Sequence, residues 1–318
     1  MFNIGIIEKI DDEGIKLLKD NKQFNYEIIE DVSKNNLIKV LPKFDGITLR
    51  VAKLDSEILK KCQKLKVISR HGVGYDNVDT KYLKENNITL LITATANAVS
   101  VAEHVMYMIL TLSKGITQYD FMVRSGEFRQ AVNQVKTFEL LEKKILILGF
   151  GRIGKILIKR CLGFEMKVYV FDPFVNKEEI ENYGGKKVDN LDHSIKNSDY
   201  ITIHMPLNEK TKNLIDIKKL KLMKKNTIII NTARGGIINE KHLDDALKQN
   251  IIFGAGLDVF EKEPINIDNV LIKNKKVLLS PHSATFTKEC KIRMGKQTVQ
   301  NLIDFFENKT KENMIVKI

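Results

Sequence analysis

Three residues in the second half of the chain carry groups that could do acid-base chemistry at a carbonyl. Arg234 follows the apolar run IIINTA, Glu263 lies in GLDVFEKEP, and His282 ends LLSPH. A guanidinium can hold a carboxylate and polarise an adjacent carbonyl through its rigid fork of donors. An imidazole can exchange a proton near neutral pH, and a neighbouring carboxylate would orient it and favour its protonated form. Because each residue follows a strand-like run, we expect all three at one edge of a sheet.

A nucleotide-binding pattern precedes these residues. Gly149, Gly151 and Gly154 form G-x-G-x-x-G after the run KILIL, and Asp172 ends the next strand-like run. In this pattern the glycines permit a tight turn, close approach of a pyrophosphate and close packing of helix on strand, and the helix N-terminus attracts the phosphates. The carboxylate of Asp172 would accept hydrogen bonds from ribose hydroxyls and repel a 2′-phosphate, and no Arg follows it directly. We therefore predict binding of NAD rather than NADP.

Arg234, Glu263 and His282 could each also have a purely structural role. Arg234 could be a surface ion-pair partner, Glu263 one of three acids around Phe260 to Pro264, and His282 a turn residue after a proline. The glycine pattern alone could be only a turn. Their ordered combination favours a site for hydride transfer.

Short β-rich runs alternate with helical stretches, which is typical of parallel βαβ units. We predict one long, largely buried or subunit-pairing helix over residues 100–128 and an amphipathic helix over 287–309, whose inner face carries Ile292, Val299, Leu302 and Phe305. The predicted strands are 3–8, 26–30, 46–50, 65–70 and 88–93 in the first part, then 144–149, 167–172, 200–206, 227–233, 251–259 and 276–282.

Composition narrows the class of protein. The 318 residues suffice for two domains of ordinary size. No apolar run approaches the roughly 18 residues that a membrane-spanning helix needs, and the N-terminus lacks the pattern of a signal peptide. The three cysteines are isolated from one another and from histidines. We therefore expect a soluble cytoplasmic protein without disulfides or a metal site.

The net charge of +12 could indicate nucleic acid, a membrane surface, or a phosphorylated or carboxylated substrate. The lysines are mixed with Asp and Glu and form no basic arm or stripe. We expect no nucleic-acid partner and no membrane partner, and we interpret most of the charge as a solvated lysine-rich surface.

The arrangement of motifs resembles the D-isomer-specific 2-hydroxyacid dehydrogenase family over nearly the whole chain. The similar segments are HGVGYDNVD (71–79), NAVSVAEH (97–104), LGFGRIG (148–154), HMPLNEKTKNLI (204–215), LMKKNTIIINTARGGIINE (222–240), GLDVFEKEP (256–264) and SPHSA (280–284). Two positions depart from the family pattern: Phe128 stands where Trp is common, and Glu142 where Gly is usual.

The resemblance implies an α/β fold with two doubly wound parallel-sheet domains. These are a flavodoxin-like substrate domain, residues 1–97 plus 286–318, and a Rossmann NAD-binding domain, residues 98–285. It also implies a homodimer paired through the helix after Asn97. For the site, it implies that Arg234, Glu263 and His282 are catalytic and that Asp258 faces the nicotinamide amide. It further implies that the cofactor meets Arg152, Ile153, Pro206, Thr211, Thr232 and Ala233.

The substrate is less sharply indicated. The resemblance implies that the backbone at Val73 and Gly74 binds the substrate carboxylate, and Arg50 and Arg70 match basic residues that phosphoglycerate dehydrogenases use around a phosphate. We expect oxidation of D-3-phosphoglycerate to 3-phosphohydroxypyruvate, the entry to serine biosynthesis, in a short form without an appended regulatory domain. Reduction of hydroxypyruvate or glyoxylate, or broader D-2-hydroxyacid activity, is the alternative. A different class, an NAD-sensing corepressor-like protein, is less favoured because the Arg, Glu and His set is intact.

Overall fold

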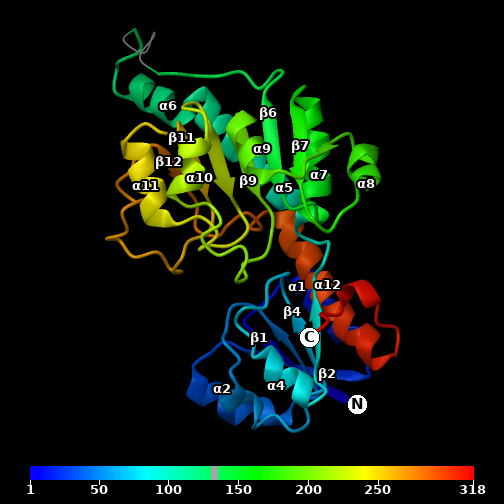
Figure 1. Ribbon diagram of the computed structural model, residues 1–318. Helices are drawn as coiled ribbons and strands as arrows, with labels where there is room; N and C mark the ends of the chain where they lie inside the picture. Colours follow the sequence, from blue (N-terminus) through cyan, green and yellow to red (C-terminus); the bar gives the residue numbers. More distant parts are fainter. Residues whose placement is uncertain (130–134) are drawn as a thin grey trace. The chain divides into compact units, whose positions relative to one another are not determined.

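The computed structural model describes residues 1–129 and 135–318 and divides the chain into two compact units (Figure 1). Unit 1 comprises Met1–Asn97 and Thr285–Ile318, and unit 2 comprises Ala98–Ala284. Thr285, which we expected to end the second domain, belongs to unit 1. No helix among the described residues is long and apolar enough to cross a membrane.

Unit 1 is built on a five-stranded parallel sheet in the order β2-β1-β3-β4-β5. The strand order reverses at β1, which lies between β2 and β3, as in flavodoxin-like sheets. The strands are β1 (Phe2–Ile7), β2 (Phe24–Ile29), β3 (Gly46–Leu49), β4 (Val67–Arg70) and β5 (Thr89–Ile92). The helices are α1 (Asp12–Lys19), α2 (Lys34–Val40), η1 (Leu41–Lys43), α3 (Ser56–Leu59), α4 (Thr80–Glu85), α12 (Lys288–Phe306) and η2 (Glu312–Met314).

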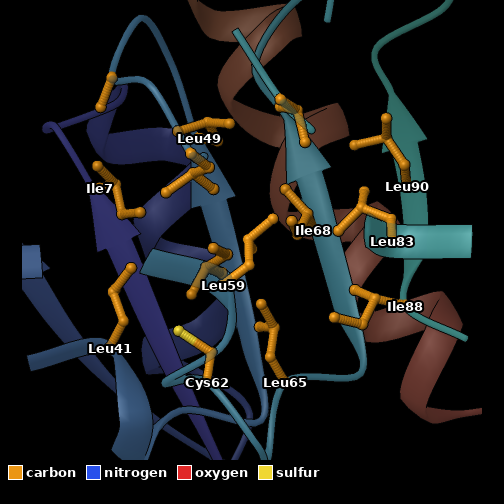
Figure 2. Packing of buried hydrophobic residues seen from close by; sticks show 14 of the residues in the cluster. Ile7, Leu41, Leu49, Leu59, Cys62, Leu65, Ile68, Leu83, Ile88 and Leu90 are labelled. Atoms are coloured by element: carbon orange, nitrogen blue, oxygen red, sulfur yellow. The ribbon is translucent and has the colours of Figure 1, made fainter. Parts of the chain in front are cut away.

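Alternation along these strands produces a hydrophobic core on each face of the sheet. Ile7, Leu49 and Ile68 pack with Leu41 and Leu83 on the face shown in Figure 2. On the other face, a second cluster contains Ile4, Ile6 and Val67 from the strands, Leu18 from α1, and Val299 and Leu302 from α12. The N-terminal and C-terminal parts of unit 1 therefore share one core.

Helix α12 packs on α1 and β4 with a face slightly rotated from the predicted one. Val299 and Leu302 are buried as expected, whereas Ile292 and Phe305 remain partly exposed. The reason is a close approach of two backbones, since a Cβ on Gly14 would lie 2.5 Å from the carbonyl of Gly295. This contact brings the Gly295 side of the helix inward.

Unit 2 is built on a seven-stranded parallel sheet in the order β12-β11-β10-β9-β6-β7-β8. Its strands are β6 (Lys144–Leu148), β7 (Lys167–Phe171), β8 (Lys186–Lys187), β9 (Tyr200–Ile203), β10 (Ile228–Asn231), β11 (Gly254–Leu257) and β12 (Val277–Leu279). The first strand of this sheet along the chain is β6. The next two strands, β7 and β8, are added on one side of it, and β9 to β12 are then added on the other side, which is the Rossmann arrangement. The predicted fold class, two doubly wound parallel-sheet domains, is confirmed.

Helices cover both faces of the second sheet (Figure 1). Ile147, Val170 and Ile230 point to the face covered by α5 and α7, and Leu148 and Ile229 point to the face covered by α9, α10 and α11. The helices are α5 (Ala98–Lys114), α6 (Ile116–Arg124), α7 (Arg152–Gly163), α8 (Lys177–Asn182), α9 (Leu191–Asn197), α10 (Ile217–Leu222) and α11 (Glu240–Lys248).

Two sequence expectations about elements in this unit were wrong. The single helix predicted over 100–128 is broken into α5 and α6 at Gly115, whose φ of +60° is left-handed. The short edge strand β8 was missed because it has only two residues, both lysines, and so has no apolar alternation.

Candidate functional site

The glycine-rich turn joins β6 to α7 at the point where the strand order of unit 2 reverses. Gly149 has φ +99°, and a Cβ there would lie 2.7 Å from the carbonyl oxygen of His204, just beyond β9. A Cβ on Gly154 would lie 2.6 Å from the carbonyl oxygen of Gly149. A Cβ on Gly151, by contrast, would meet no described atom within 4 Å. The protein's own packing therefore requires Gly149 and Gly154, whereas Gly151 faces space that a ligand could enter.

Helix α7 begins directly after this turn. Gly151 is its N-cap residue and provides no side-chain hydrogen bond to the first helical amides. These amides and the partial positive charge of the helix end suit a phosphate group. Arg152 is exposed and Ile153 partly buried at the start of the helix.

Asp172 follows β7, the neighbour of β6, and supports the turn. Its carboxylate accepts hydrogen bonds from the amide of Phe150 at 2.7 Å and the amide of Phe174 at 2.9 Å. A carboxylate has about four acceptor positions, so these two bonds leave room for ribose hydroxyls. The hydrogen bond between Asp172 and the amide of Phe150 was not predicted from the sequence, although Phe150 lies between Gly149 and Gly151 in the turn.

The loop after β9 contains two of the predicted cofactor residues. The hydroxyl of Thr211 donates to the carbonyl oxygen of Pro206 at 2.7 Å and accepts from the amide of Asn208 at 2.8 Å. The hydroxyl of Thr211 therefore stabilises the loop in which it lies. Its expected contact with the adenosine and phosphate side of the cofactor stays a prediction.

The turn after β10 carries Thr232, Ala233 and Arg234. Buried Asn231 holds this turn, because its side chain accepts from the amide of Ala233 at 3.0 Å and donates to the carbonyl oxygen of Arg234 at 2.8 Å. The hydroxyl oxygen of Thr232 is buried without a hydrogen-bond partner among the described residues. Asn231 was not predicted from the sequence, although a polar residue directly after the apolar run Ile228–Ile230 was a usable signal.

Gly235 brings this turn against the loop that carries Glu263. A Cβ at Gly235 would lie 1.8 Å from the carbonyl oxygen of Phe260. Only glycine allows this approach, so the residue after Arg234 fixes the distance between the two segments. We did not anticipate this role of the A-R-G-G sequence.

Glu263 and His282 form a direct pair. Nδ1 of His282 lies 2.7 Å from one carboxylate oxygen of Glu263, and the other oxygen accepts the amide of Phe260 at 3.0 Å. Burial of Glu263 opposes its charged form, but the bonds from His282 and Phe260 and the positive charge of Arg234 hold the pKa of this carboxyl below its ordinary value. The structure thus brings together the cation, carboxylate and imidazole that the sequence singled out.

Asp258 lies directly after β11 and is fully buried. Its carboxylate accepts the hydroxyl of Ser280 at 2.5 Å and the amides of Ser283 at 2.8 Å and Ala284 at 3.0 Å. These bonds hold the loop that contains His282, and the expectation that Asp258 also faces the nicotinamide amide stays a prediction.

The predicted substrate residues belong to unit 1. Arg50 directly follows β3, and Arg70 is the last residue of β4. The two strands are neighbours, and their register pairs Leu49 with Arg70. Nη1 of Arg50 donates to the carbonyl oxygen of Lys9 at 3.0 Å, and Nη1 of Arg70 donates to that of His71 at 2.8 Å. Burial, with the positive charges of Arg50 and Arg70, lowers the pKa of His71 to about 4.

This edge of unit 1 is therefore an electropositive site around a neutral imidazole. Val73 and Gly74 are partly buried in the loop that follows. Within residues 1–129 and 135–318, no group of three or more His, Cys, Asp or Glu could hold a metal ion.

Comparison with known proteins places this geometry in a family. Residues 106–284, more than half of the chain, match the model for the NAD binding domain of D-isomer specific 2-hydroxyacid dehydrogenases. The chain belongs to this family. The resemblance seen in the sequence motifs is confirmed, as is the NAD-binding domain.

Two curated members of the D-isomer specific 2-hydroxyacid dehydrogenase family differ in how much of their length is matched. A D-3-phosphoglycerate dehydrogenase from Archaeoglobus fulgidus is 35% identical over 94% of this chain, but the chain spans only 56% of that relative. A glyoxylate reductase from Thermococcus litoralis is 35% identical over 98% of this chain and 96% of its own length. Among solved structures, an NAD-dependent formate dehydrogenase from Staphylococcus aureus, in complex with NAD, has a TM-score of 0.86 and 29% identity, with 99% of both chains covered.

Two features of this NAD-binding domain fit a dinucleotide. The space beside Gly151 admits a pyrophosphate, and the buried hydroxyl of Thr232 has a hydrogen-bonding capacity that no described residue satisfies. Buried polar groups ordinarily have partners, so an orphan hydroxyl beside the candidate catalytic turn suits a bound nicotinamide group.

The contrast between glycines predicts the effect of adding one methyl group. Gly151→Ala should leave the free energy of unfolding within about 0.5 kcal/mol of wild type, since the methyl meets open space. It should raise the Kd for NAD at least about tenfold, because the methyl enters the path of the pyrophosphate. Urea unfolding without cofactor and titration of NADH fluorescence measure the two effects.

Gly154→Ala is the matched comparison, because its methyl would overlap the carbonyl of Gly149 and should destabilise the fold by about 1–3 kcal/mol. Unchanged NAD affinity in Gly151→Ala would contradict the assignment of the turn.

The lowered pKa of Glu263 predicts a pH-dependent contribution to stability. The unfolded carboxyl binds a proton at higher pH than the folded one, so the ionised pair stabilises the native state above the ordinary pKa and this contribution disappears as pH falls through the folded pKa. Because the Glu263 and His282 side chains are 36% and 48% exposed, we expect less than about 1 kcal/mol.

Urea unfolding of wild type and Glu263→Gln at pH 7, 5 and 4 tests this. The difference in free energy of unfolding between wild type and Glu263→Gln should become smaller toward pH 4. A difference that stays constant with pH would contradict the lowered pKa of Glu263.

Proposed function

We propose that this protein is an NAD-dependent oxidoreductase that transfers a hydride between a D-2-hydroxyacid and NAD. The single observation that supports it most is the Glu263–His282 pair at 2.7 Å, with Arg234 near enough to act on the charge of Glu263. An NAD-sensing corepressor-like role would not require such a pair.

The proposed mechanism assigns one task to each side chain. With Nδ1 engaged by Glu263, His282 uses Nε2 to accept the hydroxyl proton during oxidation and returns it during reduction. Glu263 orients the imidazole and stabilises its positive charge, and Arg234 holds the substrate carboxylate. Bound NAD supplies the acceptor of the hydride that leaves C2.

We further propose D-3-phosphoglycerate as the substrate, oxidised to 3-phosphohydroxypyruvate at the entry to serine biosynthesis. Its support is the pair of guanidinium groups at Arg50 and Arg70, since positive charge stabilises a phosphate dianion. Burial first, and then the charges of these two arginines, lower the pKa of the adjacent His71. Val73 and Gly74 are the proposed contacts of the carboxylate.

Reduction of glyoxylate or hydroxypyruvate is the second candidate. It is favoured by the match to almost the full length of the T. litoralis glyoxylate reductase.

The proposed assembly is a homodimer through α5, where Val99 and Tyr107 are 37% and 50% exposed.

Replacement of the proposed base tests the activity. His282→Ala should lower kcat by about 100- to 10,000-fold, the range typical of general-base catalysis, with little change in the Kd for NAD. The assay follows NADH absorbance with phosphoglycerate, phosphohydroxypyruvate, hydroxypyruvate, glyoxylate and pyruvate in parallel. Near-full turnover in the variant, with normal NAD binding, would eliminate His282 as the base.

Replacement of Arg50 tests the substrate. Arg50→Ala should raise KM for a phosphorylated substrate by at least about tenfold, the equivalent of one charge-assisted hydrogen bond, and change KM for glyoxylate much less. Lys9→Ala is a matched control because it keeps the backbone carbonyl that Arg50 contacts. Equal effects of Arg50→Ala on both substrates would argue against a phosphate contact.

A further inference from the structure

Helix α5 holds both ends of the short loop that contains His282. Ser100 and His104 lie one helical turn apart on α5. The hydroxyl of Ser100 donates to the carbonyl oxygen of Ala284 at 2.6 Å, and Nε2 of His104 lies 2.9 Å from the hydroxyl oxygen of Ser280. His282 stands between these two attachment points.

The hydrogen bonds at Ser280 have a defined direction. Its hydroxyl proton goes to the buried carboxylate of Asp258 at 2.5 Å, so its oxygen accepts from His104. This requires a proton on Nε2 of His104. Burial lowers the pKa of His104 and so favours the neutral ring, although the charge of Asp258 acts in the opposite direction. His104, Ser280 and Asp258 thus form a chain of donors that ends on a desolvated carboxylate.

The backbone of His282 depends on such support. Its φ of +51° lies in the left-handed region, which residues with a side chain adopt at a cost. The amide of His282 donates to the carbonyl oxygen of Ser280 at 3.1 Å, so a shift of Ser280 is transmitted directly to it. Strained conformations of this kind persist where the surroundings hold them, and here the surroundings are Asp258 and α5.

We propose that His104 and Ser280 are positioning residues that hold the loop Ser280–Ala284 so that the imidazole of His282 meets Glu263 and the substrate. The catalytic part of this inference rests on the proposed function. The two side chains act through the loop, which distinguishes them from Arg234, Glu263 and His282.

The test compares variants that remove or keep the donor at position 104. Ser280→Ala and His104→Leu should each lower kcat about 10- to 100-fold, as expected for a misplaced catalytic group, while KM for NAD stays within about twofold. His104→Gln keeps an N–H donor and should recover most of kcat. His193→Gln on α9, where the imidazole is exposed and lies within hydrogen-bond distance of the Asn197 side chain, is the matched control and should behave as wild type.

Hydrogen exchange of the 278–286 segment gives a second readout that needs no substrate. Ser280→Ala and His104→Leu should speed its exchange at least about tenfold, because the loop loses a hydrogen bond at Ser280 and the amides of Ser283 and Ala284 then separate more often from the carboxylate of Asp258. Unchanged kcat and exchange would overturn the proposal, and so would equal impairment in His104→Gln and His104→Leu. If the wild type acts on no substrate of the panel, the proposed function fails while the exchange data still decide whether the two residues hold the loop.

Discussion

The buried carboxylate of Asp258 is the constraint around which the candidate site is organised. Removing a carboxylate from water costs several kcal/mol unless donors replace the lost hydration. Ser280, Ser283 and Ala284 supply those donors, and they belong to the loop that presents His282. The need to satisfy one charge at the end of β11 therefore determines the path of the chain after β12. The sequence resemblance assigns Asp258 to the cofactor and does not indicate this second, structural role of its oxygens.

Close backbone approaches set the remaining distances. Gly149 lets β6 pass against the segment after β9, Gly154 lets α7 pack on the turn, and Gly235 lets the Arg234 turn lie against Phe260. A side chain at any of these positions would push apart segments that carry candidate site residues. Gly151 differs, because the space beside it is open to a ligand. The fold itself therefore requires glycine at positions 149, 154 and 235, whereas at position 151 only the proposed binding of NAD would require it.

The residues proposed for the chemistry and those proposed for substrate choice belong to different units. The Arg234, Glu263 and His282 set lies in unit 2, whereas Arg50, Arg70 and the neutral His71 lie in unit 1. Under the proposed function, the proton and hydride steps would need the same groups for every 2-hydroxyacid. Discrimination between a phosphate and a smaller substituent would then depend on Arg50 and Arg70 of unit 1, and relatives with different substrates are about equally similar to this chain.

The sequence by itself determined every strand of the two sheets except β8, the doubly wound class, the glycine turn with Asp172, and the position of Arg234, Glu263 and His282 after strands. These are predictable because they depend on local periodicity and on the rule that parallel strands bring their carboxyl ends to one edge. Tertiary structure alone decided the clamp by Asn231, the approach at Gly235, the break at Gly115, and the contact of His104 with Ser280, 176 residues later in the chain. Such contacts are set by how distant segments pack, and neither residue type nor local spacing records which partners meet.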